Sequence, residues 1–118
     1  MKKSSKKEIE KLLVANVRPQ EMKFVKAIVK ILKKCKVKEN SITNEGIRQR
    51  LYEKFGDLPE AYIRRYINYI RIHHLLDDVI ACRNGYFVAT TDEEVTAYVK
   101  TLRNRALSIL CVMESYEV

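Results

Sequence analysis

The sequence is poor in the residues that usually build reactive sites. Its 118 residues include three glycines, and no glycine-rich phosphate loop or nucleophile elbow occurs. Carboxylates cluster at Asp77-Asp78 and Asp92-Glu93-Glu94. The second cluster falls in the first turn of a predicted helix, where the helix dipole favours acidic side chains. We therefore expect a protein that is not an enzyme and that needs no cofactor.

Cysteine and histidine are scarce as well. Cys35, Cys82 and Cys111 are odd in number, widely spaced and set among apolar residues, which indicates buried thiols rather than a disulfide framework. His73 and His74 are adjacent, so on a helix they point about 100° apart. No cysteine lies near them, and the four-ligand spacing of a zinc site is missing. We expect no metal.

Long apolar runs are absent too. No stretch approaches the roughly 20 residues that a membrane span needs. The N-terminal MKKSSKKEIEK has no following apolar region, so it is not a secretory signal. An apolar fraction of 47% and a charged fraction of 32% are typical of a soluble protein. These features predict one cytoplasmic domain that does not bind membranes.

Charge is distributed unevenly. Residues 1–38 hold 13 Lys and Arg against 3 Asp and Glu, a net of +10, whereas residues 39–118 hold 10 against 12, a net of −2. The total of +8 therefore comes from the first third of the chain. Such asymmetry fits a polyanionic partner, and it equally fits a lysine-rich surface that keeps the protein in solution.

Hydrophobic periodicity and end signals predict five helices. Thr43 looks like the N-cap of one helix and Gly56 like its end, while Asp57-x-x-Glu60 and Thr91-x-x-Glu94 look like capping boxes. Ile42 is placed in a very short strand. The predicted helices cover about residues 6–16, 19–35, 44–55, 58–74 and 92–116.

A β-hairpin is predicted between the last two helices. Val79–Cys82 and Tyr86–Ala89 are β-prone runs, and Asn84-Gly85 lies between them. Asn-Gly is a strong hairpin signal because both residues tolerate positive φ.

This order of elements resembles the winged helix-turn-helix family. The stretch GYFVATTDEEVTAYVKTLRNRALSIL is similar to winged-helix proteins of phages and mobile elements, and the resemblance covers about residues 19–112. It implies a mainly α fold with a small β-hairpin wing, an extra N-terminal helix and a long C-terminal helix. Family members often carry a glycine before the wing, where this chain has His73 to Asp78. That departure leaves the angle of the wing open.

Three regions follow from this resemblance. Residues 1–18 form a basic N-terminal arm and short helix, and residues 19–91 form the winged helix-turn-helix domain. Residues 92–118 form a C-terminal helix with a continuous apolar stripe. That helix either folds back over the domain or pairs with a second copy to make a homodimer.

The resemblance implies sequence-specific binding of double-stranded DNA. Helix 58–74 would enter the major groove, and wing 79–89 would contact the adjacent backbone or minor groove. Such a protein would be a small transcriptional regulator or a phage or mobile-element accessory protein. The residues expected to contact DNA are Arg64, Arg65, Asn68, Arg71, Arg83, Lys2, Lys3, Lys6 and Lys7.

Residue chemistry agrees with this hypothesis. Arginine bonds guanine bidentately and asparagine bonds adenine in the same way, and Arg64, Asn68 and Arg71 share one helix face. The alternative for that face is an ordinary solvated surface. The alternative function is a winged-helix protein–protein interaction module in a replication or regulatory complex. RNA binding is a third possibility, but the basic segments lack the interleaved aromatic residues that stack on bases.

Overall fold

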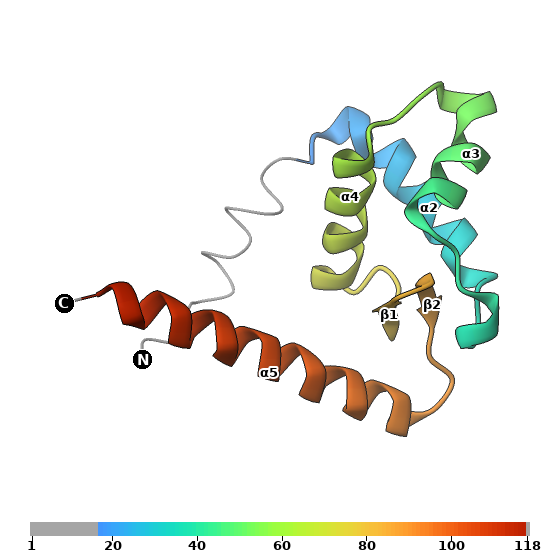
Figure 1. Cartoon of the computed structure of the whole chain (residues 1–118). Coiled ribbons are helices and arrows are strands. Elements are labelled where there is room, and N and C mark those ends of the chain that lie inside the picture. Colours follow the sequence, from blue (N-terminus) through green and yellow to red (C-terminus); the bar gives the residue numbers. More distant parts are fainter. Residues whose placement is uncertain (1–16, 118) are drawn as a thin grey trace.

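Helices dominate the chain, and one small hairpin accompanies them. The computed structural model describes residues 17–117. Short 3-10 turns lie at Pro19–Glu21 and Lys38–Asn40. The helices are α2 (Met22–Lys33), α3 (Asn44–Phe55), α4 (Glu60–Ile72) and α5 (Asp92–Tyr116), and the strands are β1 (Val79–Cys82) and β2 (Gly85–Val88). In Figure 1, α2, α3 and α4 lie together, the hairpin lies at one end of this group, and α5 runs past the hairpin at the same end.

Local end signals explain where α3 begins and ends. The Thr43 hydroxyl oxygen accepts a hydrogen bond from the Gly46 amide at 3.0 Å, as expected of an N-cap. The helix ends at Gly56, whose φ of 75° is disfavoured for residues with a Cβ. The predicted capping role of Asp57 is wrong. Its carboxylate accepts from Arg48 at 2.7 Å instead, and α4 begins after Pro59 without a side-chain cap.

The core lies between the three grouped helices. Each contributes one apolar face, and the faces meet because their buried residues recur at helical spacing. Tyr66 is the largest of the fully buried side chains, and its ring stacks on Phe24 at 5.8 Å between centroids. The buried side chains of α2, α3 and α4 are Val25, Ile28, Leu32, Ile47, Leu51, Ile63, Tyr66, Ile67 and Ile70.

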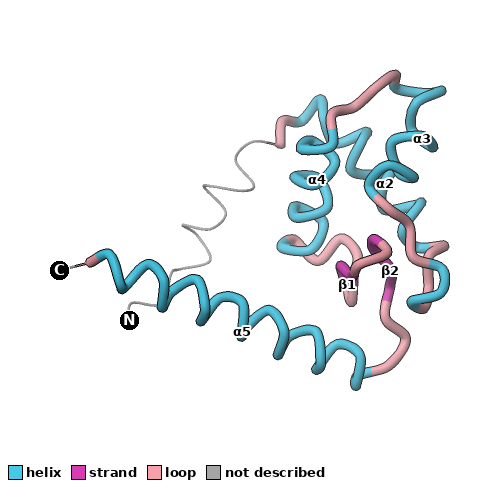
Figure 2. Tube along the Cα trace, in the orientation of Figure 1, coloured by secondary structure: helices cyan, strands magenta, loops and turns pink. Residues whose placement is uncertain are grey.

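The hairpin is tied to the segment between α2 and α3. The Ile42 amide donates to the Tyr86 carbonyl at 2.9 Å, and the Tyr86 amide donates to the Ile42 carbonyl at 2.8 Å. This exchange confirms that Ile42 pairs as a very short strand. It places the hairpin against one end of the helical core, which Figure 2 shows by the two strands below α4 and α2.

The hairpin itself was predicted correctly, but its turn differs. Val79 pairs with Val88 and Cys82 with Gly85, so the two turn residues are Arg83 and Asn84. Neither has a positive φ, whereas Gly85 has a φ of 116°. The glycine therefore provides the unusual backbone conformation at the start of β2.

At Gly85 the backbone of the hairpin also comes very close to the backbone of Ile42. A Cβ at this position would lie 2.1 Å from the Ile42 carbonyl oxygen, whereas a Cβ at Gly56 would meet nothing within 4 Å. We predict that Gly85→Ala destabilises the fold clearly more than Gly56→Ala. Both variants bear the strain of a positive φ, about 1–3 kcal/mol, but only the first pushes the hairpin off Ile42. Urea denaturation of the two variants checks this, and equal losses would contradict it.

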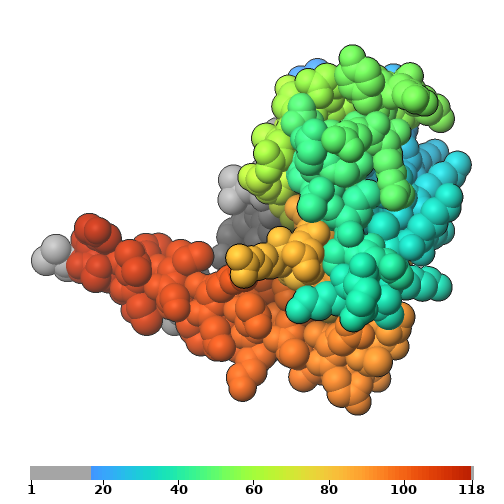
Figure 3. Space-filling view, turned by 45° about the vertical axis from the view of Figure 1, so that its right-hand side comes forward, coloured from blue at the N-terminus to red at the C-terminus, as the bar shows by residue number. Residues whose placement is uncertain are grey.

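Helix α5 rests on the hairpin only through its first turns. Val95 and Tyr98 pack against a small cluster formed by Ile80, Phe87 and Ala89. Beyond them the helix leaves the body of the protein, as Figure 3 shows, and none of its residues is buried. No helix among residues 17–117 is long and apolar enough to cross a membrane.

The bounds of α3 and α5 match the predicted ones closely, and α4 is shorter by two residues at each end than the predicted 58–74. The predicted helix 6–16 lies outside the described residues. The three cysteines are free thiols, as expected, and Cys35 is buried. The expectation of burial is wrong for Cys111, which is exposed on α5, while Cys82 is half-buried.

Candidate nucleic-acid interface

The outer face of α4 carries the polar side chains that the sequence placed there. Arg64 is exposed, and Asn68 and Arg71 are half-buried, all three on the side away from the buried Ile63 and Ile67. This arrangement follows from helical periodicity, because positions three and four apart share a face. The face is thus formed by a helix that is fixed in place by its other side.

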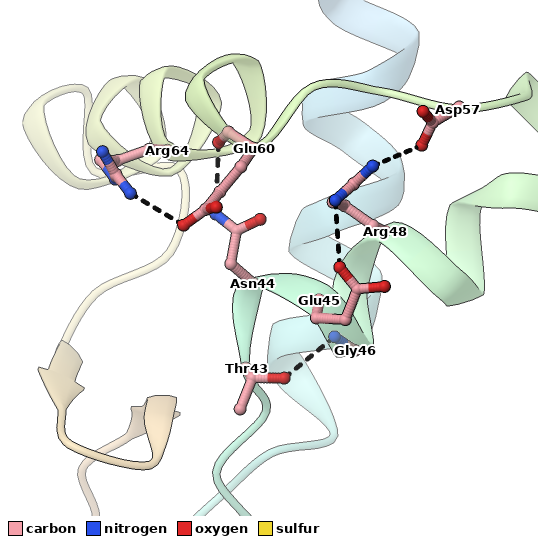
Figure 4. A network of polar contacts seen from close by, with 8 residues as sticks. All are labelled: Thr43, Asn44, Glu45, Gly46, Arg48, Asp57, Glu60 and Arg64. Atoms are coloured by element: carbon pink, nitrogen blue, oxygen red, sulfur yellow. Dashed lines mark hydrogen bonds and ion pairs between the residues drawn. The ribbon is translucent and has the colours of Figure 1, made fainter.

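Arg64 is the most accessible of these residues. Its guanidinium contacts Glu60 one turn earlier at 2.9 Å, and both side chains are about 60% exposed. An exposed pair of this kind contributes little stability, so the arginine can exchange Glu60 for another acceptor. Figure 4 shows Glu60 between Arg64 and Asn44, whose side-chain amide donates to the Glu60 carbonyl at 3.3 Å.

A second set of polar contacts joins α3 to the connection that leads to α4. Arg48 donates to Glu45 at 3.0 Å and to Asp57 at 2.7 Å, as Figure 4 shows. The hydrogen bond from Arg48 to Asp57 raises the pKa of Arg48 above its ordinary value. Because Asp57 belongs to the connection between the helices, the ion pair ties that connection to α3.

Arg71 is held by α5. Its guanidinium donates to the Tyr98 hydroxyl at 2.7 Å and lies 5.4 Å from the centre of the Tyr98 ring. To reach a base, Arg71 would have to give up this contact. No local pattern predicts this contact, because the two residues lie 27 positions apart.

Arg65 is engaged on another side of α4. It donates to Glu21 at 3.1 Å and lies over the Tyr62 ring, 4.6 Å from its centre. Its side chain is 27% exposed. Arg65 therefore lines a hollow of about 500 Å³ between the start of α2 and α4, rather than extending the face of Arg64 and Asn68.

Glu21 is the electrostatic centre of that hollow. Its carboxylate accepts hydrogen bonds from the Tyr66 hydroxyl, from Arg65 and from the Arg18 amide. The Tyr66 hydrogen bond, helped by the others, holds the pKa of Glu21 below 4.5. Burial and the neighbouring carboxylate raise the pKa of Tyr66 to about 12. The ionised glutamate and the neutral tyrosine thus stabilise each other.

Other predicted contacts are more dispersed. Arg83 lies exposed at the hairpin turn, as expected of a wing tip. The basic arm of Lys2, Lys3, Lys6 and Lys7 lies outside the described residues. The lysines of α2 and the one that follows it are exposed on the side opposite the apolar face of α2, so they do not extend the α4 face. These are Lys23, Lys26, Lys30, Lys33 and Lys34.

The connection from α4 to β1 has no glycine, although winged helix-turn-helix proteins often carry one there. His74 has a φ of 56° and Asp78 a φ of 64°, both in the left-handed region that favours glycine. The chain thus makes its turn into the hairpin without one. His74 lies 3.1 Å from Asp77, and the Asp77 and Asp78 side chains are exposed.

No metal-binding group of three or more His, Cys, Asp or Glu side chains occurs within residues 17–117. Comparison with protein-family models, with curated proteins and with solved structures gives no match to this chain.

The contact between Glu21 and Tyr66 gives a pH-dependent prediction. Tyr66→Phe removes a hydrogen bond to a charged group and should cost about 2 kcal/mol near neutral pH. In the native protein, the Glu21 contribution is present above pH 4.5 and is lost as the pH falls through its lowered pKa. The Tyr66 contribution is present below pH 10.0 and is lost as the pH rises toward 12.

Urea denaturation across the pH range measures both effects. The Tyr66→Phe variant should lose less stability than the native chain when the pH is lowered. It should also lose less stability than the native chain when the pH is raised. Tyr52→Phe is the control, because the Tyr52 side chain is 61% exposed and its variant should match the native chain. Parallel pH curves for the native chain and Tyr66→Phe would contradict the assigned role.

Proposed function

We propose that this protein is a winged helix-turn-helix protein that binds double-stranded DNA in a sequence-specific manner. Helix α4 would lie in the major groove, and the hairpin would act as the wing. The observation that carries the proposal is the pair of the exposed Arg64 and the half-buried Asn68 on the outer face of a helix whose other side is buried. The short connection from α3 and the hairpin that follows α4 support it.

The chemistry of the face suits base readout. Arg64 and Asn68 are one helical turn apart, so they can address neighbouring base pairs, Arg64 favouring guanine and Asn68 favouring adenine. Arg83 at the hairpin turn is placed to contact phosphate or the minor groove. The exposed lysines and the basic N-terminal segment add attraction that does not depend on sequence.

This proposal corresponds to a cytoplasmic transcriptional regulator, or to an accessory protein of a phage or mobile element. A second copy of the chain is the other proposed partner, bound through α5. A two-fold dimer would match the symmetry of a palindromic DNA site.

Two substitutions on α4 test base readout. Arg64→Ala combined with Asn68→Ala should reduce the preference for a selected duplex over random duplex by about tenfold or more, since each good base contact contributes about 1–3 kcal/mol of discrimination. Arg50→Ala is the control, because Arg50 is exposed on α3 and its substitution removes one positive charge, as the double variant does. It should weaken binding to all sequences alike.

Fluorescence anisotropy over a salt series measures these affinities. The native chain should lose affinity steeply with salt, by about 0.9 in the logarithmic slope for each phosphate contacted. Equal losses on selected and random duplexes in the double variant would overturn the assignment of base readout. Absence of binding even at low salt would overturn DNA binding and favour the protein-interaction module.

A further inference from the structure

The exposed part of α5 has the sequence pattern of a coiled coil. Beyond the turns that rest on the hairpin, apolar residues recur at alternating steps of three and four, as in the two seam positions of a heptad repeat. This seam extends over 18 residues, or about 27 Å of helix. Its members are Val99, Leu102, Ala106, Ile109, Met113 and Tyr116.

The seam is uncovered in the described chain. Leu102 is 38% exposed, Ile109 69% and Tyr116 82%. Val99 is 44% exposed and Met113 47%. Two such seams in contact would bury an area near the lower limit of specific interfaces, about 1,200 Å² in total. By contrast, Val95 is also apolar but is already packed against the hairpin cluster, so the available seam begins at Val99.

We propose that α5 pairs with α5 of a second copy as an antiparallel two-stranded coiled coil, with its two-fold axis between Leu107 and Ser108. In this register all six seam residues are used and none is left over. Val99 of each copy meets Tyr116 of the other, and Leu102 meets Met113. The small Ala106 meets the larger Ile109, and Val99 meets the larger Tyr116, so in these two layers a smaller side chain faces a larger one.

Charge selects the antiparallel arrangement. Lys100, Arg103 and Arg105 lie in the first half of the exposed helix, Glu114 lies in its second half, and Glu117 follows its last residue. An antiparallel pair places the basic half of each copy beside the acidic half of the other. A parallel pair would place three cations of one copy level with the same three of the other, which costs Coulomb energy.

The dimer depends on α5 alone and holds whether or not the protein binds DNA. Light scattering of the full chain should give twice the 13.9 kDa mass of one chain. Leu102→Lys with Ile109→Lys places two charges in the seam and should halve that mass. Thr101→Lys with Ser108→Lys is the matched control, since it adds the same charge at the same spacing on an exposed side of α5 that is turned about 120° from the seam. It should remain a dimer.

Two results would overturn the interface. One is a dimer that survives the seam substitutions. The other result is that the native chain is a monomer. In that case, removing residues 1–16 tests what covers the seam of α5. If the shortened chain dimerises, the N-terminal segment of the same chain covers the seam. If it stays monomeric, a foreign partner is left as the occupant.

Cysteine cross-linking tests the orientation. In a Cys111→Ser background, which removes the exposed native thiol, Leu102→Cys and Met113→Cys are made as separate variants. The proposed register puts residue 102 of one copy beside residue 113 of the other, while the two residues 102 lie about 16 Å apart along the helix, beyond the reach of a disulfide. A mixture equilibrated before oxidation should cross-link, and each variant alone should not. Cross-linking of each variant alone would show a parallel pair.

Discussion

The arrangement of the whole molecule depends on the close approach of the hairpin to the backbone of Ile42. Two hydrogen bonds between Ile42 and Tyr86 make the segment between α2 and α3 a third, one-residue strand. They place the hairpin at one end of the helical core, and α5 starts from the strand so placed. The approach is possible only because position 85 lacks a side chain. One glycine therefore allows the hairpin, and with it the start of α5, to lie against this end of the helical core.

The contact between Arg71 and Tyr98 joins the two surfaces for which we propose partners. Arg71 belongs to the outer face of α4, and Tyr98 lies one residue before the seam of α5. DNA that drew Arg71 away would break this one hydrogen bond while Val95 stayed packed on the hairpin. A neutral hydrogen bond contributes about 1 kcal/mol, and one from a charged donor somewhat more. Releasing Arg71 from Tyr98 would thus weaken DNA binding by a fewfold to about tenfold in affinity, and because Tyr98 is not a seam residue, this cost is the same for one copy and for a dimer.

Local sequence signals predicted the helices and the hairpin. The prediction failed where a residue has a partner from another part of the chain. Thr43 and Thr91 cap α3 and α5 because a capping bond spans only three residues and needs no distant group. Asp57 has the same spacing to Glu60, but Arg48 offers it a charged donor, so it does not cap α4. Such competition between a local and a distant partner is not visible in a sequence pattern.

The candidate face on α4 was predictable for the same reason, since periodicity alone places Arg64, Asn68 and Arg71 together. The partners of Arg65 and Arg71 were not, because Glu21 and Tyr98 come from distant parts of the chain. For α5, the sequence left two possibilities, a helix folded back over the domain or one paired with a second copy. A folded-back helix would have its stripe covered by the helical body, yet within residues 17–117 the seam residues from Val99 to Tyr116 stay exposed. Its heptad spacing and its self-complementary charges then favour an identical helix as the partner.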